Sequence, residues 1–118
     1  AMQISEDKRF YGISPDDIRP LFYNRAQSEH LAAVPLTLPP QPALPLAGKV
    51  TLTEECFGKV AKTYICCLDD KVIPISHQRH MMKQQACKEM VQLDTDHSPF
   101  LSCPETLAAV LHSASLAD

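Results

Sequence analysis

The chain has 118 residues, and its 14 acidic and 11 basic side chains give a formal net charge of -3 at neutral pH. This length suits one domain or part of a larger one. The mildly acidic balance argues against binding to nucleic acid or another polyanion, and an apolar content of 45% is too high for a disordered protein.

The first part of the chain, up to about residue 48, is expected to form helix, turn and proline-rich loop. Ser14 and Pro15 stand before two acidic residues, a pattern typical of a helix start. Residues 28–34 predict a second short helix, which Pro35 stops.

Residues 31–48 carry no charge and are long enough to suggest a membrane span. The stretch contains five prolines, which exclude one continuous membrane helix. It is expected to be an irregular, partly buried connection. The N-terminal residues lack the apolar stretch of a signal peptide, and the five cysteines are an odd number. Both observations predict a reduced protein of the cytoplasm.

The second part of the chain reads as strand, helix, strand and helix. Residues 63–68 and 89–93 are short apolar runs typical of buried strands. A helix is expected from residue 76 to about 86. A last helix, up to about residue 116, is expected to begin at a capping box over residues 102–105. Its inner stripe is expected at Leu107, Val110, Leu111 and Ala114.

Two strands joined through a helix by short links predict a right-handed βαβ unit in a parallel sheet. Two parallel strands are not stable alone, because both faces and both edges of such a sheet need cover. The predicted fold class is therefore a partial α/β domain. It combines a helical segment over residues 1–48 with a βαβα segment over residues 49–118, and its missing strands must come from elsewhere.

Candidate chemistry lies where the two predicted strands end. Asp69 and Asp70 follow the first strand, and His97 follows the second. Sites in parallel sheets lie beyond the carboxyl ends of the strands, so a carboxylate and an imidazole are expected to meet there. A carboxylate that holds one ring nitrogen orients histidine as a general base. From spacing alone, a loop-capping aspartate and a surface histidine remain the alternative.

A family resemblance is found in residues 57–74, Gln78, Arg79, residues 96–100 and Pro104. These segments resemble the C-terminal third of α/β-hydrolase-fold esterases, which include plant methyl salicylate and methyl jasmonate esterases, hydroxynitrile lyases and bacterial alkyl salicylate esterase-like proteins. The resemblance implies that Asp70 is the acid of a catalytic triad and His97 its base. It also implies that residues 1–48 are a remnant of the helical cap, and that residues 49–118 are the C-terminal portion of the core.

The nucleophile of that family is absent from this sequence. It stands on a Gly-x-Ser-x-Gly turn, and none of the three glycines here belongs to such a motif. The loop that forms the oxyanion hole is also missing. The chain is therefore expected to be a fragment that is inactive alone, since the nucleophile and the oxyanion hole carry most of the rate.

Further residues or pairs of residues are candidates for a site. Ser98 follows His97 and is a candidate to bind substrate, with a turn hydroxyl before Pro99 as the alternative. His77 and His80 are three positions apart on the predicted helix, but this spacing alone is weak evidence for a metal site, so no metal and no cofactor are expected. Cys66 and Cys67 lie within a predicted strand, where packing is favoured over a role as nucleophile.

The leading functional hypothesis is the C-terminal part of a serine carboxylic ester hydrolase, acting in the parent enzyme on a small-molecule ester. Two alternatives stay open, namely a non-catalytic remnant that acts as an oligomeric or binding module, and a parent similar to the hydroxynitrile lyases. The uncovered sheet edge predicts a homo-oligomer or association with a missing N-terminal half. No membrane or nucleic-acid partner is expected.

Overall fold

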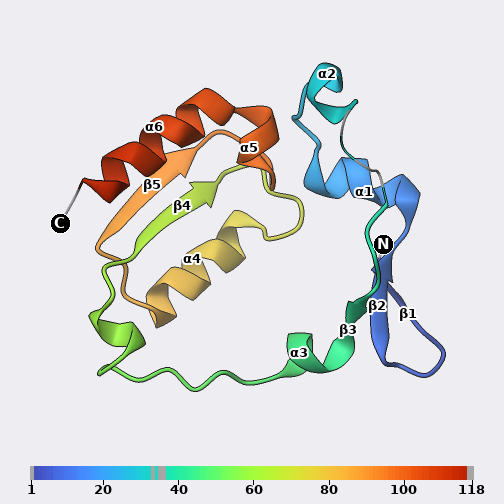
Figure 1. Cartoon of the computed structure of the whole chain (residues 1–118), viewed down its shortest axis with the longest axis horizontal. Coiled ribbons are helices and arrows are strands. Elements are labelled where there is room, and N and C mark those ends of the chain that lie inside the picture. Colours follow the sequence, from blue (N-terminus) through green and yellow to red (C-terminus); the bar gives the residue numbers. More distant parts are fainter. Residues whose placement is uncertain (1, 33, 35–36, 117–118) are drawn as a thin grey trace. The chain divides into compact units, whose positions relative to one another are not determined.

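The computed structural model describes residues 2–32, 34 and 37–116 (Figure 1). The chain divides into two compact units that alternate along the sequence. The first unit comprises Ala1–Arg19 and Pro35–Val60, and the second comprises Pro20–Val34 and Ala61–Asp118. None of the described helices has the length and apolar character needed to span a bilayer.

The first unit contains a small antiparallel sheet that the sequence did not predict. Its described strands are β1 (Met2–Ile4), β2 (Phe10–Ile13) and β3 (Gln41–Pro42), in the order β1-β2-β3. The three residues of β1 are all exposed, and their alternation of apolar and polar side chains is too short to mark a strand in the sequence. A helix, α3 (Ala43–Ala47), and a 3-10 turn, η1 (Phe57–Lys59), complete the unit.

The expectation of an irregular connection over residues 31–48 was therefore wrong in part. The Ala43 amide donates to the carbonyl of Arg9 at 2.7 Å, and Gln41 pairs with Tyr11. Proline favours an extended backbone and is tolerated on an edge strand, which explains how Pro42 takes part in β3. The proline-rich composition hides this strand from sequence analysis.

The helices before this connection agree more closely with expectation. α1 spans Pro15–Phe22 and begins where the sequence predicted. α2 spans only Ser28–Leu31 and is shorter than predicted. Pro35, the predicted stop of this second helix, lies outside the described residues.

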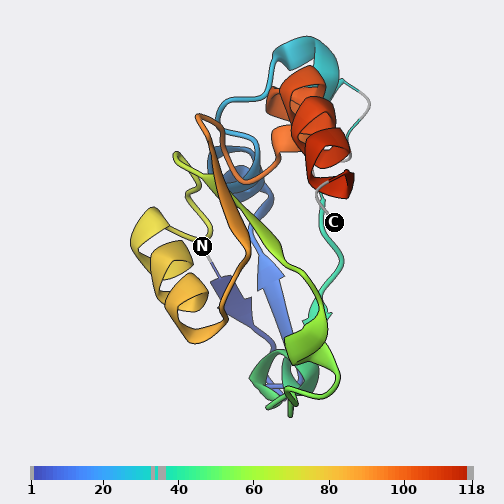
Figure 2. The ribbon, with the colours of Figure 1, turned by 90° about the vertical axis from the view of Figure 1, so that its left-hand side faces the viewer.

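The second unit contains the predicted βαβ arrangement. β4 (Thr63–Cys67) pairs in parallel with β5 (Glu89–Leu93), and α4 (Ile75–Gln84) connects the two strands. The chain then forms α5 (Pro99–Ser102) and α6 (Pro104–Ser115). Figures 1 and 2 show α4 and α6 on opposite sides of the β4–β5 sheet. This parallel pair with a helix on each face confirms the predicted α/β class.

The start of the last helix differs from the predicted capping box. Cys103 is the N-cap residue of α6, and no side chain caps the helix there. Ser102 instead ends α5, and its hydroxyl donates to Asp96 Oδ1 at 2.8 Å. The Ser102 hydroxyl thus serves the buried Asp96 carboxylate, with a charge-assisted hydrogen bond, and not the first amides of α6.

The core of the second unit is small. Its buried apolar side chains among the described residues are Tyr23, Ala26, Leu31, Cys66 and Leu93. α6 has no buried residue, and Leu111 of its predicted inner stripe is 53% exposed. Leu107, Val110 and Ala114 are half-buried, so the predicted stripe was wrong only at Leu111. A two-stranded sheet is too narrow to cover a whole helix face, which explains why none of these residues is fully buried.

Candidate active site

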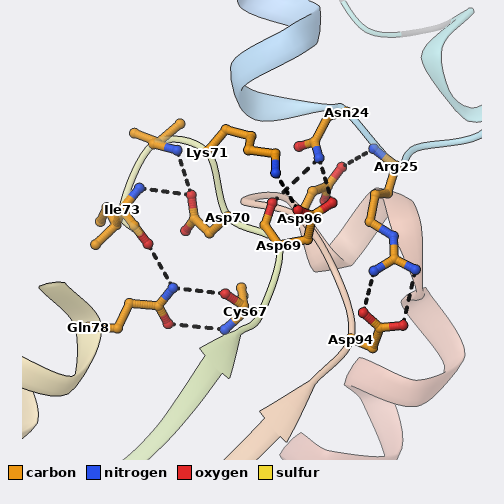
Figure 3. A network of polar contacts seen from close by, with 11 residues as sticks. Asn24, Arg25, Cys67, Asp69, Asp70, Lys71, Ile73, Gln78, Asp94 and Asp96 are labelled. Carbon is orange, nitrogen blue, oxygen red and sulfur yellow. Dashed lines mark hydrogen bonds and ion pairs between the residues drawn. The ribbon is translucent and has the colours of Figure 1, made fainter. Parts of the chain in front are cut away.

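The loop after β4 holds the carboxylate of Asp70 in one orientation. Asp70 Oδ1 accepts the backbone amides of Val72 and Ile73, each at 2.8 Å (Figure 3). Its side chain is only 6% exposed. The loop closes on its own aspartate because this side chain readily accepts amides two and three positions further along the chain.

The second carboxylate oxygen of Asp70 faces His97. His97 Nδ1 lies 2.9 Å from Asp70 Oδ2. An ionised carboxylate only accepts hydrogen bonds, so Nδ1 carries the proton and the neutral ring presents a lone pair at Nε2. The structure thus brings together the two residues that the strand ends predicted. The imidazole also packs edge-on against the ring of Phe22, the last residue of α1, with 5.2 Å between the two ring centroids.

The acid and the base differ in exposure. The His97 side chain is 29% exposed, against 6% for Asp70. A cavity of about 220 Å³ lies beside both side chains, and β4 contributes Tyr64, Ile65 and Cys67 to its lining. The acid is thus buried, whereas the imidazole is partly exposed beside a cavity that a third group can enter.

Asp69, the other aspartate at the end of the first predicted strand, forms its side-chain contacts away from His97. Its carboxylate pairs with Lys71, which lowers the pKa of Asp69, and it accepts Asn24 Nδ2 at 3.0 Å. Asp69 therefore ties its loop to the segment after α1.

Sequence reasoning missed Asp96, which is fully buried. Its oxygens accept three donors, namely the amide of Arg25 at 2.8 Å, the amide of Ser98 at 3.0 Å and the hydroxyl of Ser102 at 2.8 Å. Figure 3 shows Asp96 beside Arg25, whose guanidinium also pairs with Asp94. The position of Asp96 directly before His97 was its only mark in the sequence.

Ser98 lies within this buried turn. It is 3% exposed, and its carbonyl accepts the amides of Leu101 and Ser102 at 2.9 and 3.1 Å. Ser98 is not among the residues that line the cavity beside His97. The structure therefore does not bring Ser98 to that cavity, and its contact with substrate stays a prediction.

The remaining candidates are two histidines of α4 and the cysteines of β4. The rings of His77 and His80 are 6.3 Å apart, and the described residues contain no group of three His, Cys, Asp or Glu side chains arranged to hold a metal ion. Cys67 lines the cavity, but burial raises the pKa of its thiol to about 11. Such a thiol is protonated at neutral pH, so it makes a poor nucleophile.

The sequence has relatives among characterised proteins, although no family model matches it. It is 32% identical over 100 residues to methylesterase 7 of Arabidopsis thaliana, a match that covers 82% of this chain and 38% of the relative. It is also 30% identical over 95 residues to putative methylesterase 13 of the same plant, which it covers to 21%. The chain spans well under half the length of these relatives.

Solved structures match nearly the whole chain. A pyrethroid hydrolase from Sphingobium faniae superposes with a TM-score of 0.83 at 24% identity, covering 98% of this chain and 47% of the hydrolase. These matches and the βαβ unit identify the fold as the C-terminal portion of an α/β-hydrolase fold. In sequence, the homologues of this chain are the plant methylesterases.

Proposed function

We propose that this chain supplies the acid and the base of a serine carboxylic ester hydrolase and is inactive by itself. One observation carries the proposal, namely the 2.9 Å hydrogen bond between Asp70 Oδ2 and His97 Nδ1 at the ends of two adjacent parallel strands. Homology to methylesterases supports an ester as substrate. Asp70 is the acid and His97 the base of the proposed site.

In the proposed reaction, His97 Nε2 takes the proton of a serine hydroxyl as the serine oxygen attacks the ester carbonyl. Asp70 accepts a hydrogen bond from Nδ1–H, stays ionised and stabilises the imidazolium that forms. The imidazolium then gives its Nε2 proton to the departing alkoxide, which leaves as an alcohol. Water then attacks the acyl-serine while His97 takes the water proton. The imidazolium returns this proton to the serine oxygen as the carboxylic acid leaves, which restores the serine hydroxyl and the neutral histidine.

The proposal requires a second polypeptide segment, because the serine has no Gly-x-Ser-x-Gly motif in this sequence. The open edge of β4 supports such an association. Among the described strands, β4 pairs only with β5 in this sheet, and the amide of Leu68 points to β5. Backbone groups alternate in direction along a strand, so Thr63 and Ile65 direct theirs away from β5. Exposed strand edges of this kind bind further strands.

We propose the rest of the α/β-hydrolase fold as the occupant of this edge, with a second copy of the chain as the competing occupant. Light scattering after size-exclusion chromatography separates the two, because only the second copy raises the mass of the isolated chain. The small-molecule ester and the cytoplasmic location stay parts of the proposal.

The isolated chain tests the claim of inactivity. We expect the chain to hydrolyse p-nitrophenyl acetate no faster than the variant His97→Ala does, and neither to exceed the rate in buffer. Hydrolysis by the chain alone that requires His97 would contradict the proposal.

A chimaera tests the roles of Asp70 and His97. The chain replaces the matching segment of Arabidopsis methylesterase 7, and p-nitrophenyl acetate is again the substrate. We expect activity that falls about a thousandfold or more in Asp70→Asn and His97→Ala, whereas Asp69→Asn and His77→Ala keep it. A folded chimaera without ester hydrolysis would contradict the proposal, and cleavage of a cyanohydrin instead would favour a lyase parent.

A further inference from the structure

Gln78 stands out as a buried polar side chain in a helix that is otherwise at the surface. It lies in the first turn of α4, it is 2% exposed, and it is the one buried residue of that helix. Burial of an uncharged amide without partners costs stability, so such a side chain is kept only where it is hydrogen-bonded.

The NH2 group and the oxygen of this amide form hydrogen bonds with two residues that flank Asp70 along the chain. Gln78 Nε2 donates to the carbonyls of Cys67 at 2.8 Å and Ile73 at 2.7 Å. Gln78 Oε1 accepts the amide of Cys67 at 3.1 Å. Figure 3 shows the Gln78 amide facing Cys67 and Ile73.

The bonds to Cys67 imitate a neighbouring strand. The amide of Leu68 donates to Leu93 of β5, so the peptide groups of Cys67 point to the other side of β4. There the side-chain amide of Gln78 offers one acceptor and one donor, as the backbone of a paired strand does. Gln78 thus satisfies the last residue of β4 without a strand beside it.

The bond to Ile73 extends this support to the acid. The Ile73 carbonyl accepts Gln78 Nε2, while its amide donates to Asp70 Oδ1. Asp70 Oδ2 in turn accepts a hydrogen bond from His97 Nδ1. A continuous set of hydrogen bonds therefore runs from Gln78 through Ile73 and Asp70 to the imidazole.

The geometry points to Gln78 as a positioning residue for Asp70. It holds the end of β4 and the far end of the acid loop at a fixed separation, which keeps the Asp70 carboxylate aimed at His97. A catalytic meaning of this role rests on the function proposed above. Gln78 also lines the cavity beside His97, but its side-chain hydrogen bonds go to Cys67 and Ile73 and not to the imidazole.

The unmodified chain offers the first test. Hydrogen exchange of the Gln78 side-chain amide, measured by NMR, is expected to be at least about tenfold slower than that of Gln84, which is exposed on the same helix. Equal exchange rates for the two side chains would overturn the inference. This measurement requires no variant to fold.

Two variants test the effect on the acid loop. Gln78→Met keeps the side-chain volume but removes every hydrogen bond, and Gln78→Glu replaces the donor by an oxygen that faces two carbonyls. In both we expect the amides of Val72 and Ile73 to exchange at least about tenfold faster and the His97 Nδ1 proton resonance to broaden or vanish. Gln84→Met is the matched control and is expected to change neither. Unchanged exchange and resonance in folded Gln78 variants would overturn the inference.

The chimaera separates this inference from the proposed function. There, Gln78→Met is expected to lower kcat about tenfold or more and to leave KM nearly unchanged, because it disturbs the acid and not the binding of ester. If the chimaera is inactive but the exchange results hold, the proposed function fails and the support of Asp70 by Gln78 stands. If the chimaera is active and Gln78→Met keeps its kcat, the positioning role fails alone.

Discussion

The loop that carries Asp70 and the loop that carries His97 meet at the Asp70–His97 hydrogen bond and at the bond from the Asp69 amide to the Thr95 carbonyl. Different kinds of partner hold the carboxylates of the two loops. The hydrogen bonds that orient the Asp70 carboxylate and the loop end are local, since they involve Val72, Ile73 and Gln78 within eleven positions along the chain. Asn24 binds only the neighbouring Asp69, from 45 positions away. The His97 loop depends on Asp96, which accepts the amide of Arg25 from 71 positions away.

This difference indicates that local sequence holds the Asp70 carboxylate, whereas the Asp96 carboxylate depends in part on tertiary structure. Local hydrogen bonds form with little loss of chain entropy, whereas a contact between distant segments requires the fold to be in place. The position of His97 should therefore be more sensitive to substitution than that of Asp70. Substitutions at Asp96 and its partners test this difference most directly.

The largest effect is expected for Asp96→Ala. The substitution leaves the amides of Arg25 and Ser98 and the hydroxyl of Ser102 without their buried acceptor. Each buried donor left without its acceptor costs about 1–3 kcal/mol, so for three donors we expect a loss of about 3–5 kcal/mol in the free energy of unfolding, measured by urea denaturation. Asp96→Asn keeps one acceptor oxygen and should fall between this variant and the parent chain.

Asp94→Ala is the matched control, since Asp94 lies two residues away and its side chain is 75% exposed. It should shift the urea midpoint far less. Equal losses in the two variants would show that burial of Asp96 does not stabilise the His97 loop.

The second largest effect concerns the thiol at the base of the Asp70 loop. Burial, and then the charge of Asp70, raise the pKa of Cys67 from 9.0 to about 11. At pH 8 this leaves about a hundredfold less thiolate than an ordinary thiol has, so alkylation by iodoacetamide should be slowed at least to that extent. Exposed Cys56 is the internal control, followed by mass spectrometry of the digested chain. Labelling of both cysteines at one rate would contradict the packing of this loop.

The two loops also differ in how far sequence analysis reached. β4, α4 and β5 were predicted because their apolar runs and turns are local, and the strand ends then brought Asp70 and His97 together. Asp96 and Gln78 escaped, since a buried polar side chain has no periodic pattern and is recognised only by its partners. α5 was missed because Ser98 and Pro99 are typical turn residues. The described strands of the first unit have only 3, 4 and 2 residues, so any alternation along them is too short to detect in the sequence.

A smaller effect is expected for Ser102→Ala, which removes one of the three donors to Asp96. The hydroxyl also lies within hydrogen-bond reach of Thr95, so the network loses a link but no carboxylate. We expect a loss of about 1 kcal/mol in the free energy of unfolding. Ser115→Ala removes an exposed hydroxyl bond to His112 and serves as control. A loss as large as that of Asp96→Ala would mean that the hydroxyl, and not the amides, dominates the network.

The smallest effect is expected for Arg25→Ala, because the backbone amide that reaches Asp96 is kept. The variant loses only the ion pair with Asp94, whose side chains are 38% and 75% exposed, and exposed pairs contribute little. The hydrogen bond from Arg25 lowers the pKa of Asp94 below its ordinary value of 3.8. A lowered aspartate pKa stabilises the fold above that ordinary value, and the stabilisation is lost as the pH falls through the lowered pKa. The small difference in urea midpoint between Arg25→Ala and the parent chain should therefore be present at pH 7 and shrink below pH 3.8. A difference that persists in acid, or one that equals the effect of Asp96→Ala, would mean that the Arg25 guanidinium holds the His97 loop by a contact other than Asp94.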